Sequence, residues 1–326
     1  MKAILCKKWG EPNSLVLEEV ESKPLKSGEI KLKVRAAGVN FPDILMIQGK
    51  YQFKPDFPFS PGAEAAGEVL EVANDVKNVN IGDRVVAMTG HGAFAEEVIT
   101  PASKVTHIED EMDFITAASL TLTYGTTAHA LIQRGKLKKD EYLLVHGAAG
   151  GVGLAAVEIG KALGAKIIAT AGTEQKLSVA KQHGADHLIN YTSMPLFKDE
   201  VKRITNNTGA NVIYDPVGGD IFDQSLRCIS WEGRLLVIGF ASGRIPQAPA
   251  NLALLKSCDI VGVFWGAWTE RDPMGHKKNM EIITKWWKEG KINPRISLTV
   301  PLEKTSEALN ALASRKVTGK AVITMD

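Results

Sequence analysis

One stretch of the sequence, YLLVHGAAGGVGLAAVEIGKAL from Tyr142 to Leu163, combines residue types that favour phosphate binding. Leu143 to Val145 predict a short strand buried on both faces, and the glycine-rich residues 147–153 can adopt backbone angles closed to residues with a Cβ. From Leu154 onward the spacing is helical. A helix start leaves backbone N–H groups unpaired and carries the positive end of the helix dipole, so a pyrophosphate fits there without a cationic side chain.

The glycine positions match the dinucleotide-binding pattern G-x-G-x-x-G with its first glycine replaced. Ala148, Gly150 and Gly153 hold the three fixed positions, and Gly151 and Val152 lie between the last two. Alone the pattern is weak, because a tight turn between a strand and a helix has the same composition. However, a second apolar strand follows after a helix of the length that a right-handed crossover needs, and more strand and helix pairs come after it. This context favours a dinucleotide site.

The end of the second strand bears on the type of nucleotide. NAD sites place an acidic side chain there, about 20 residues past the glycine turn, to bind the ribose hydroxyls. Here the strand ends in residues 170–173, Thr-Ala-Gly-Thr, without a carboxylate. Glu174 is the nearest acid, but behind a threonine N-cap we expect it to support the first turn of a helix.

The composition is that of an ordinary globular protein of 326 residues, long enough for two domains. Lys and Arg total 39 against 37 Asp and Glu, so neither nucleic-acid nor membrane-surface binding has electrostatic support, and a small-molecule partner is favoured. Cys6, Cys228 and Cys258 are too scattered for a disulfide framework or a cysteine zinc site, which favours a reducing cytoplasm. No apolar run reaches membrane-spanning length, and an early strand leaves no room for a signal peptide.

Two kinds of pattern divide the chain. Residues 1–122 are β-rich, with strand candidates at Glu29 to Arg35, Glu64 to Val72, Arg84 to Met88 and Ala93 to Thr100. After a helical stretch, six apolar strands alternate with helices and predict a doubly wound sheet: Tyr142 to Val145, Lys166 to Thr170, His187 to Ile189, Val212 to Tyr214, Arg234 to Ile238 and Asp259 to Phe264. The tail from about Gly266 is too short for a domain of its own, so we expect it to complete the first one.

The order of these elements and several motifs resemble the medium-chain dehydrogenase/reductase superfamily and, within it, the zinc-free quinone oxidoreductase group. The motifs are AAGVNFPD at 36–43, FPFSPGAEAAGEV at 57–69, GDRVVAM at 82–88, GAFAEEV at 92–98, TYGTTAHAL at 123–131, HGAAGGVG at 146–153, GADHLINY at 184–191 and GKAVI at 319–323. The resemblance implies an α/β fold with two parts. A Rossmann doubly wound parallel sheet in residues 123–265 would bind the nucleotide. Residues 1–122 and 266–326 would form a discontinuous, β-rich, GroES-like catalytic domain.

The resemblance also bears on metal binding. Zinc alcohol dehydrogenases of the superfamily hold a catalytic zinc with a cysteine and a histidine, and the corresponding positions here look like Asn40 and Ala63. An amide and a methyl group do not supply the thiolate and imidazole that zinc prefers, so we expect no metal. None of the seven histidines forms a close pair at ligand spacing with a cysteine or carboxylate set. We expect each to be a surface or packed histidine, with His146 near the pyrophosphate turn.

By the same resemblance, the cofactor is NADPH. Lys176 lies where related quinone oxidoreductases place a lysine on the 2′-phosphate, and Tyr191 matches the tyrosine that accompanies it. Without the family, Lys176 would be taken as a solvated helix lysine. The motifs imply further cofactor contacts. These are Gly150, Gly151, Val152, Gly153, Gly172 and Thr173, then Asn40 and Thr127 near the nicotinamide ribose and phosphates, and Gly239, Phe240, Phe264 and Trp265 facing the nicotinamide.

Without a metal, hydride from NADPH needs an acceptor that is already electron-poor, such as a quinone or an alkene conjugated to a carbonyl. Tyr51 falls where quinone reductases and enoyl-thioester reductases of the family carry an active-site tyrosine, and Asn40 and Asp43 lie on the adjoining turn as further catalytic candidates. A phenol there can hydrogen-bond the oxygen on which charge develops and donate a proton after hydride addition. The alternative for Tyr51 is an aromatic side chain packed on a proline-rich loop.

Three functions remain open from the sequence. The first, which we favour, is an NADPH:quinone oxidoreductase. The second is a reductase of an enoyl thioester such as acryloyl-CoA, or of a free enone, for which Lys50, Lys54 and Arg271 are candidates for a basic rim. The third is a redox-inactive nucleotide-binding protein. We expect a cytoplasmic homodimer that acts on a small molecule.

Overall fold

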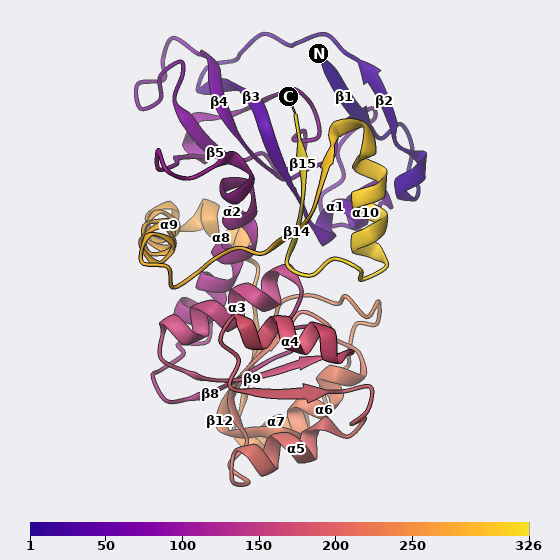
Figure 1. Cartoon of the computed structure of the whole chain (residues 1–326), viewed down its shortest axis with the longest axis vertical. Coiled ribbons are helices and arrows are strands. Elements are labelled where there is room, and N and C mark those ends of the chain that lie inside the picture. Colours follow the sequence, from indigo (N-terminus) through magenta and orange to yellow (C-terminus); the bar gives the residue numbers. More distant parts are fainter. Residues whose placement is uncertain (326) are drawn as a thin grey trace. The chain divides into compact units, whose positions relative to one another are not determined.

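The computed structural model describes residues 1–325 and separates into two compact units. The first takes Met1–Leu122 and the segment from Ile296 onward, and the second takes Thr123–Arg295. In Figure 1 the first unit is indigo to purple with its late strands in yellow, and the second runs from magenta to orange. Within residues 1–325 no helix is both long and apolar enough to cross a membrane.

The end of the second unit differs from the expected boundary at residue 266. Residues 266–295 belong to the second unit and not to the first. They include most of α8 (Trp265–Arg271) and all of α9 (Pro273–Lys288), and Asn279 of α9 exchanges two hydrogen bonds with Gln133 of the second unit. A helical pattern shows which face of a helix is apolar but not the core against which that face packs. The assignment of this segment to the first domain was therefore wrong.

The first unit is built on a seven-stranded sheet with the neighbour order β14-β15-β3-β4-β5-β7, and β6 also pairs with β3. Only β14 and β15 are parallel to each other. The strands are β3 (Glu29–Val39), β4 (Glu64–Val72), β5 (Arg84–Met88), β6 (Glu97–Pro101), β7 (Val105–His107), β14 (Ile296–Pro301) and β15 (Lys320–Thr324). A separate antiparallel pair and three helices complete the unit: β1 (Lys2–Leu5), β2 (Val16–Glu19), α1 (Phe41–Ile47), α2 (Phe114–Ala128), which continues into the second unit, and α10 (Thr305–Ala313).

The last strand, β15, lies inside the sheet of the first unit, between β14 and β3. In β15, Ala321 pairs with Val39 of β3, and Figure 1 shows these two strands side by side although the chain between them is long. One expected strand is shorter than its pattern: β6 begins at Glu97 and not at Ala93. The amides of Ala93 and Phe94 bond to the loop at residues 61–62, and the amide of Glu96 bonds to Lys2 of β1 and not to β3, which explains the later start.

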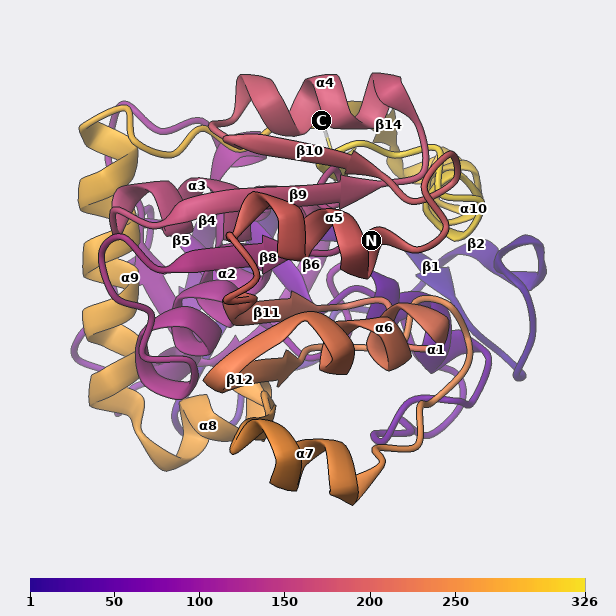
Figure 2. The same ribbon diagram turned by 90° about the horizontal axis from the view of Figure 1, so that it is seen from below.

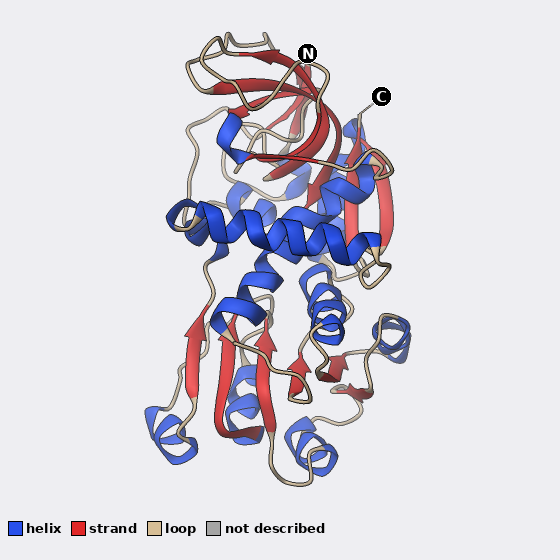
Figure 3. Ribbon diagram, turned by 90° about the vertical axis from the view of Figure 1, so that its left-hand side faces the viewer, coloured by secondary structure: helices blue, strands red, loops and turns tan. Residues whose placement is uncertain are grey.

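The second unit is a six-stranded parallel sheet with the order β10-β9-β8-β11-β12-β13, which is the Rossmann order 3-2-1-4-5-6. Figure 3 shows the long red arrows of this sheet pointing in the same direction. The strands are β8 (Tyr142–Val145), β9 (Lys166–Ala171), β10 (His187–Asn190), β11 (Ala210–Asp215), β12 (Ile229–Val237) and β13 (Asp259–Gly262). The helices between them are α3 (Gly151–Ala162), α4 (Glu174–Gln182), α5 (Phe197–Ile204), α6 (Asp220–Cys228) and α7 (Ala250–Lys256). The expected doubly wound α/β sheet is confirmed.

Helices cover both faces of this sheet. Figure 2 shows α5 and α6 in front of the strands and α3 behind them. Buried Leu144, Ile168, Ile213 and Leu235 come from four neighbouring strands and form the apolar core between the layers. The strand order reverses between β8 and β11, and ligands of such sheets bind beyond the carboxyl ends of the strands at this point.

Candidate active site

The turn after β8 has the geometry of a phosphate site. Gly147 has a φ of 58°, and Gly150, in an extended conformation, is the N-cap residue of α3. The amide of Leu154 donates to the carbonyl oxygen of Gly150 at 2.8 Å. The amides of residues 151–153 precede this bond at the helix start, where an anion accepts hydrogen bonds. A Cβ on Gly153 would collide with the carbonyl oxygen of Gly147, so the turn requires glycine there.

His146, next to this turn, is buried and neutral. Its Nδ1 lies 2.9 Å from the hydroxyl of Thr170 and its Nε2 2.8 Å from the hydroxyl of Ser225. Because Ser225 donates its own hydrogen to the carbonyl oxygen of Ile221 at 2.7 Å, it accepts from Nε2–H, and Nδ1 then accepts from Thr170. Burial lowers the pKa of His146 to about 3. The imidazole therefore links the end of β8 to β9 and α6 through hydrogen bonds.

Thr127, expected near the nicotinamide ribose, is also fully buried. Its hydroxyl donates to the carbonyl oxygen of Thr123 at 2.8 Å and lies 2.9 Å from the phenol oxygen of Tyr214, which can donate to it. The same hydroxyl is 3.4 Å from the carbonyl oxygen of Val152 in the turn. Thr127 thus holds α2 against the turn and β11, and its direct contact with a nucleotide stays a prediction.

At the end of β9, the start of α4 has the expected cap. Thr173 is the N-cap residue, and its hydroxyl accepts a hydrogen bond from the amide of Lys176 at 3.3 Å. Glu174 accepts a hydrogen bond from the amide group of Asn190 at 2.7 Å. The nearest carboxylate after this strand is therefore already bound to the end of the neighbouring strand.

Tyr191 follows β10 and lies over the end of β9. A Cβ on Gly172 would be 3.2 Å from Cε2 of the Tyr191 ring, so glycine allows the ring to approach the backbone. Thr192 donates its hydroxyl to the carbonyl oxygen of Gly172 at 2.9 Å and fixes the same contact. The structure thus brings Gly172, Thr173 and Tyr191 together, with Lys176 in the first turn of the helix that starts there.

The four residues expected near the nicotinamide differ in exposure. Phe240 is exposed beside Gly239 after β12, and Phe264, at the start of α8, is 58% exposed. Trp265 is only 5% exposed, and its Cζ2 lies 2.6 Å from the position of a Cβ on Gly125 of α2. Trp265 is therefore a core residue, and Phe264 presents the ring that a ligand can contact.

The first unit holds a buried polar cluster formed by Asn40, Asp43, Glu64 and Lys320. Lys320 of β15 donates to Oδ1 of Asn40 at 2.5 Å and to the carboxylate of Glu64. The Asn40 amide group donates to Glu64 at 2.9 Å and to the carbonyl oxygen of Gly38 at 3.2 Å. The backbone amide of Asn40 donates to the Asp43 carboxylate at 2.8 Å, which closes the capping box of α1.

This network fixes the orientation of the Asn40 amide. Lysine has no acceptor and an ionised carboxylate has no donor, so the oxygen of Asn40 faces Lys320 and its NH₂ group faces Glu64. Both amide hydrogens and one oxygen lone pair are then engaged. Asn40 has one lone pair left for a ligand, so the network favours a positioning role over proton transfer.

Asp43 and Tyr51 are electrostatically linked. Asp43 is fully buried, and its Oδ1 has no hydrogen-bond partner among residues 1–325. Burial raises the pKa of Asp43 to about 7, although the Asn40 amide and the charge of Lys320 lower it. Tyr51 is half-buried against the apolar core of the first unit, and burial and then the negative charge of Asp43 raise its pKa. Tyr51 is therefore a protonated phenol beside a carboxyl group that titrates near neutrality.

Glu64 and Lys320 were not predicted from the sequence as members of this cluster. Both stand in otherwise apolar strand segments, AEAAGEV and GKAVI. A charged side chain is rarely buried unless it is paired, so a lone charge in a buried strand was the available signal.

The donor set at this place does not fit zinc. The Asn40 amide is bound within the cluster and Ala63 offers only a methyl group, whereas zinc prefers thiolate and imidazole. Within residues 1–325 no group of three His, Cys, Asp or Glu side chains is arranged to hold a metal ion.

Comparison with known proteins agrees with this geometry. Two family models match: an alcohol dehydrogenase GroES-like domain at residues 26–110 and a zinc-binding dehydrogenase at residues 151–277. A quinone oxidoreductase-like protein 2 homolog of Nematostella vectensis is 40% identical over 99% of this chain and 88% of its own length. A quinone oxidoreductase of Pseudomonas aeruginosa is 34% identical over 99% of both chains. The chain belongs to the medium-chain dehydrogenase/reductase superfamily, in its quinone oxidoreductase group.

The solved structures support the same assignment. Escherichia coli quinone oxidoreductase complexed with NADPH matches with a TM-score of 0.93 and 30% identity, covering 100% of both chains. The expected combination of a Rossmann sheet with a GroES-like part is confirmed, and the protein is an oxidoreductase enzyme. The redox-inactive alternative is thereby set aside.

Proposed function

We propose that this oxidoreductase uses NADPH to reduce a quinone and that it does so without zinc. The observation that carries the proposal is the end of β9. Its nearest acid, Glu174, is bound to Asn190, while Tyr191 covers Gly172 and Lys176 lies in the first turn of the next helix. This strand end lacks the free carboxylate of an NAD site and suits the additional phosphate of NADPH.

Residues of this chain would hold the cofactor in three places. The amides of residues 151–153 bind the pyrophosphate, Lys176 and Tyr191 bind the 2′-phosphate, and the exposed ring of Phe264 packs against the nicotinamide. When bound, NADPH supplies the hydride. Zinc independence is supported by the donor set, because Asn40 and Ala63 replace both expected ligands.

The second candidate, reduction of an enoyl thioester or free enone, is favoured by Tyr51 and Asp43. Hydride addition to the alkene leaves negative charge on the carbonyl oxygen, and a proton must then be added. Tyr51 donates a hydrogen bond or proton to that oxygen, and Asp43, uncharged below about pH 7, then places no negative charge near the phenol that would weaken it as a donor. A quinone needs this proton source less, because water protonates the hydroquinone product.

We further propose a cytoplasmic homodimer. Helix α7 has no buried residue, and the edge strand β13 leaves Ile260 exposed, which suits an interface between two copies. Cys6, Cys228 and Cys258 are free thiols, as expected in a reducing compartment.

Steady-state NADPH oxidation with a benzoquinone, acryloyl-CoA and crotonyl-CoA tests the choice of acceptor. The proposal expects the quinone to have the highest kcat/KM and NADPH to be preferred to NADH. A higher kcat/KM for either thioester would select the second candidate. Metal analysis of the purified enzyme should find no stoichiometric zinc, and a chelator should leave the rate unchanged.

A further inference from the structure

The second unit contains a pocket of ≈ 440 Å³ next to Phe264, and no role has so far been given to most of the side chains that line it. It lies where the π-helical segment His129–Arg134 meets the end of β13 and α8. The side chains around it are His129, Gln133, Arg134, Phe264, Trp268 and Arg271. Its volume is within the range of small-molecule sites, roughly 300–1,000 Å³.

Two arginines at this cavity have guanidinium groups only partly used by the protein. Arg134 donates one hydrogen bond through Nε to the carbonyl oxygen of Gly262 at 3.0 Å, and Arg271 donates one to the carbonyl oxygen of Ala267 at 3.0 Å. These bonds hold each side chain to the cavity wall. Among residues 1–325 neither arginine has a carboxylate partner, so their remaining N–H donors can bind an anion.

The wall between the arginines is aromatic. The Trp268 ring stacks on His129 with centroids 4.1 Å apart and an interplanar angle of 18°. Phe264 adds an exposed ring. His129 is only 4% exposed, and burial lowers its pKa, which disfavours the charged form of the ring that stacks on Trp268.

Among the described residues, none that lines the pocket carries a carboxylate to oppose an anion. Asp272 follows Arg271 in the chain, but its carboxylate accepts a hydrogen bond from the amide of Gly275 at 2.9 Å and caps α9. The charged groups that line the cavity are thus both cationic.

We propose that this cavity binds a flat ligand that carries a carboxylate, sulfonate or phosphate group. Arg134 and Arg271 bind the anion, and Trp268 packs against the flat part. The ligand is either an anionic substituent of the substrate, in which case the inference rests on the proposed function, or a separate small molecule. Both have the same chemistry, and the experiment distinguishes them.

Binding is measured first by calorimetry without turnover, with 2-naphthoate as the anionic probe and neutral 2-naphthamide as its match. Arg134→Gln and Arg271→Gln should each weaken naphthoate binding about tenfold or more, the loss expected for one charge-assisted hydrogen bond, and leave naphthamide unchanged. Arg227→Gln, an exposed arginine of α6, is the matched control and should change neither probe. Trp268→Ala should weaken both probes. Equal naphthoate affinity in all three arginine variants, or no binding to the wild type, overturns the proposal.

Kinetics then separate the two sources of the ligand. For a substrate substituent, naphthoate competes with the quinone, and the KM of a naphthoquinone sulfonate rises about tenfold or more in the Arg134 and Arg271 variants while that of the neutral naphthoquinone does not change. For a separate molecule, naphthoate binds without competing with either quinone. If naphthoate does not bind but the quinone is still reduced, the anion pocket is wrong and the proposed function stands. If naphthoate binds but no quinone is reduced, only the proposed function is contradicted.

Discussion

The proposed preference for NADPH over NADH rests on a few side chains after β9. We expect Lys176→Ala to weaken NADPH binding about tenfold or more, because a charge-assisted hydrogen bond to phosphate contributes about 1.5–3 kcal/mol, and to leave NADH binding unchanged. Fluorescence titration of both nucleotides measures this difference. Lys181→Ala, at the other end of α4, is the matched control. Equal weakening of both nucleotides by Lys176→Ala would contradict the phosphate role.

The phenol of Tyr51 is tested by removing its oxygen alone. If it stabilises the developing oxyanion, Tyr51→Phe should lower kcat for an enone or enoyl thioester about 10²–10³-fold, with NADPH affinity and melting temperature preserved. Quinone reduction should fall less, since water protonates the hydroquinone. In the wild type, the enone rate should decline as the pH rises through about 7, where Asp43 loses its proton. An unchanged kcat on every substrate would return Tyr51 to a packing role.

Buried His146 makes the stability of the enzyme depend on pH. Burial lowers its pKa to about 3 from an ordinary 6.5, so between these values the unfolded chain binds more protons than the folded one. Stability therefore falls as the pH drops through this window and is not affected by His146 above it. We expect His146→Gln, which keeps a donor and an acceptor but does not titrate, to be less stable at neutral pH and to lose less stability on acidification. Urea unfolding across a pH series measures both effects, and equal acid slopes for the two proteins would contradict them.

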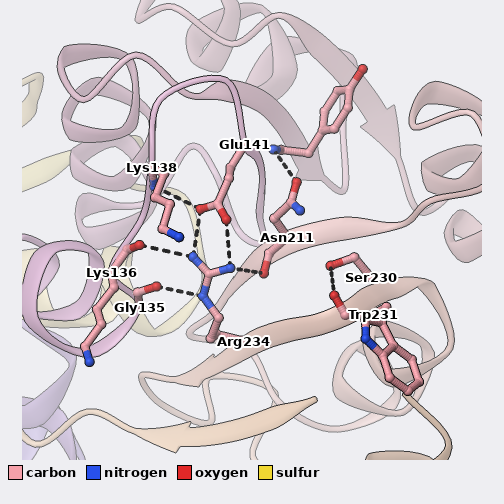
Figure 4. Close-up of polar contacts among 9 residues, drawn as sticks. Gly135, Lys136, Lys138, Glu141, Asn211, Ser230, Trp231 and Arg234 are labelled. Atoms are coloured by element: carbon pink, nitrogen blue, oxygen red, sulfur yellow. Dashed lines mark hydrogen bonds and ion pairs between the residues drawn. The ribbon is translucent and has the colours of Figure 1, made fainter. Parts of the chain in front are cut away.

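At the scale of elements, one ion pair joins several strands of the parallel sheet (Figure 4). Arg234 of β12 donates to both carboxylate oxygens of Glu141, which precedes β8, at 2.9 and 2.7 Å. It also donates to the carbonyl oxygens of Gly135, Lys136 and Asn211 at 2.8, 3.2 and 3.2 Å. The guanidinium thus connects β12, β11 and the segment that enters β8.

Removing this guanidinium should destabilise the second unit. Arg234→Met leaves the largely buried Glu141 without its main partner, at a cost of roughly 1–3 kcal/mol. Arg203→Met, which breaks an exposed pair with Glu200 on α5, is the control and should cost little.

Burial raises the pKa of Glu141, but the hydrogen bonds from Arg234 and Lys138 lower it by more, so the net shift of this pKa is downward. The contribution of the pair is therefore present at neutral pH and lost as the pH falls through the folded-state pKa. A double-mutant cycle of Arg234→Met and Glu141→Gln measures the coupling free energy of the pair. A coupling of zero would contradict a stabilising role for this ion pair.

Local patterns predicted the parallel strands well, because strands buried on both faces are continuous apolar runs bounded by turns. The Thr173 cap was predicted for the same reason, since its signal lies within four residues. The buried cluster of the first unit was not predictable in this way. Lys320 and Glu64 are 256 residues apart in sequence, and only the strand order β15-β3-β4 brings them together. The assignment of residues 266–295 failed similarly, because packing partners distant in sequence decide it.

At the scale of the whole molecule, the second unit leaves apolar side chains on its surface. Leu254 and Leu255 of α7 are 80% and 66% exposed, and Ile245 before this helix and Ile260 on the edge strand β13 are exposed as well. An unpaired strand edge with apolar neighbours favours association with another chain. A second copy of this chain would cover both features, which is the basis of the proposed homodimer.

Charged substitutions on α7 test that dimer directly. We expect the wild type to elute with the mass of a dimer in size-exclusion chromatography with light scattering, and Leu254→Asp with Leu255→Asp to elute as a folded monomer, because burying two unpaired carboxylates in an apolar interface is strongly unfavourable. Leu196→Asp, an equally exposed leucine beside α5, is the matched control and should remain dimeric. If the α7 double variant has the same dimer dissociation constant as the wild type, the interface lies elsewhere. If the wild type is a monomer at the concentration of the assay, the homodimer proposal is wrong.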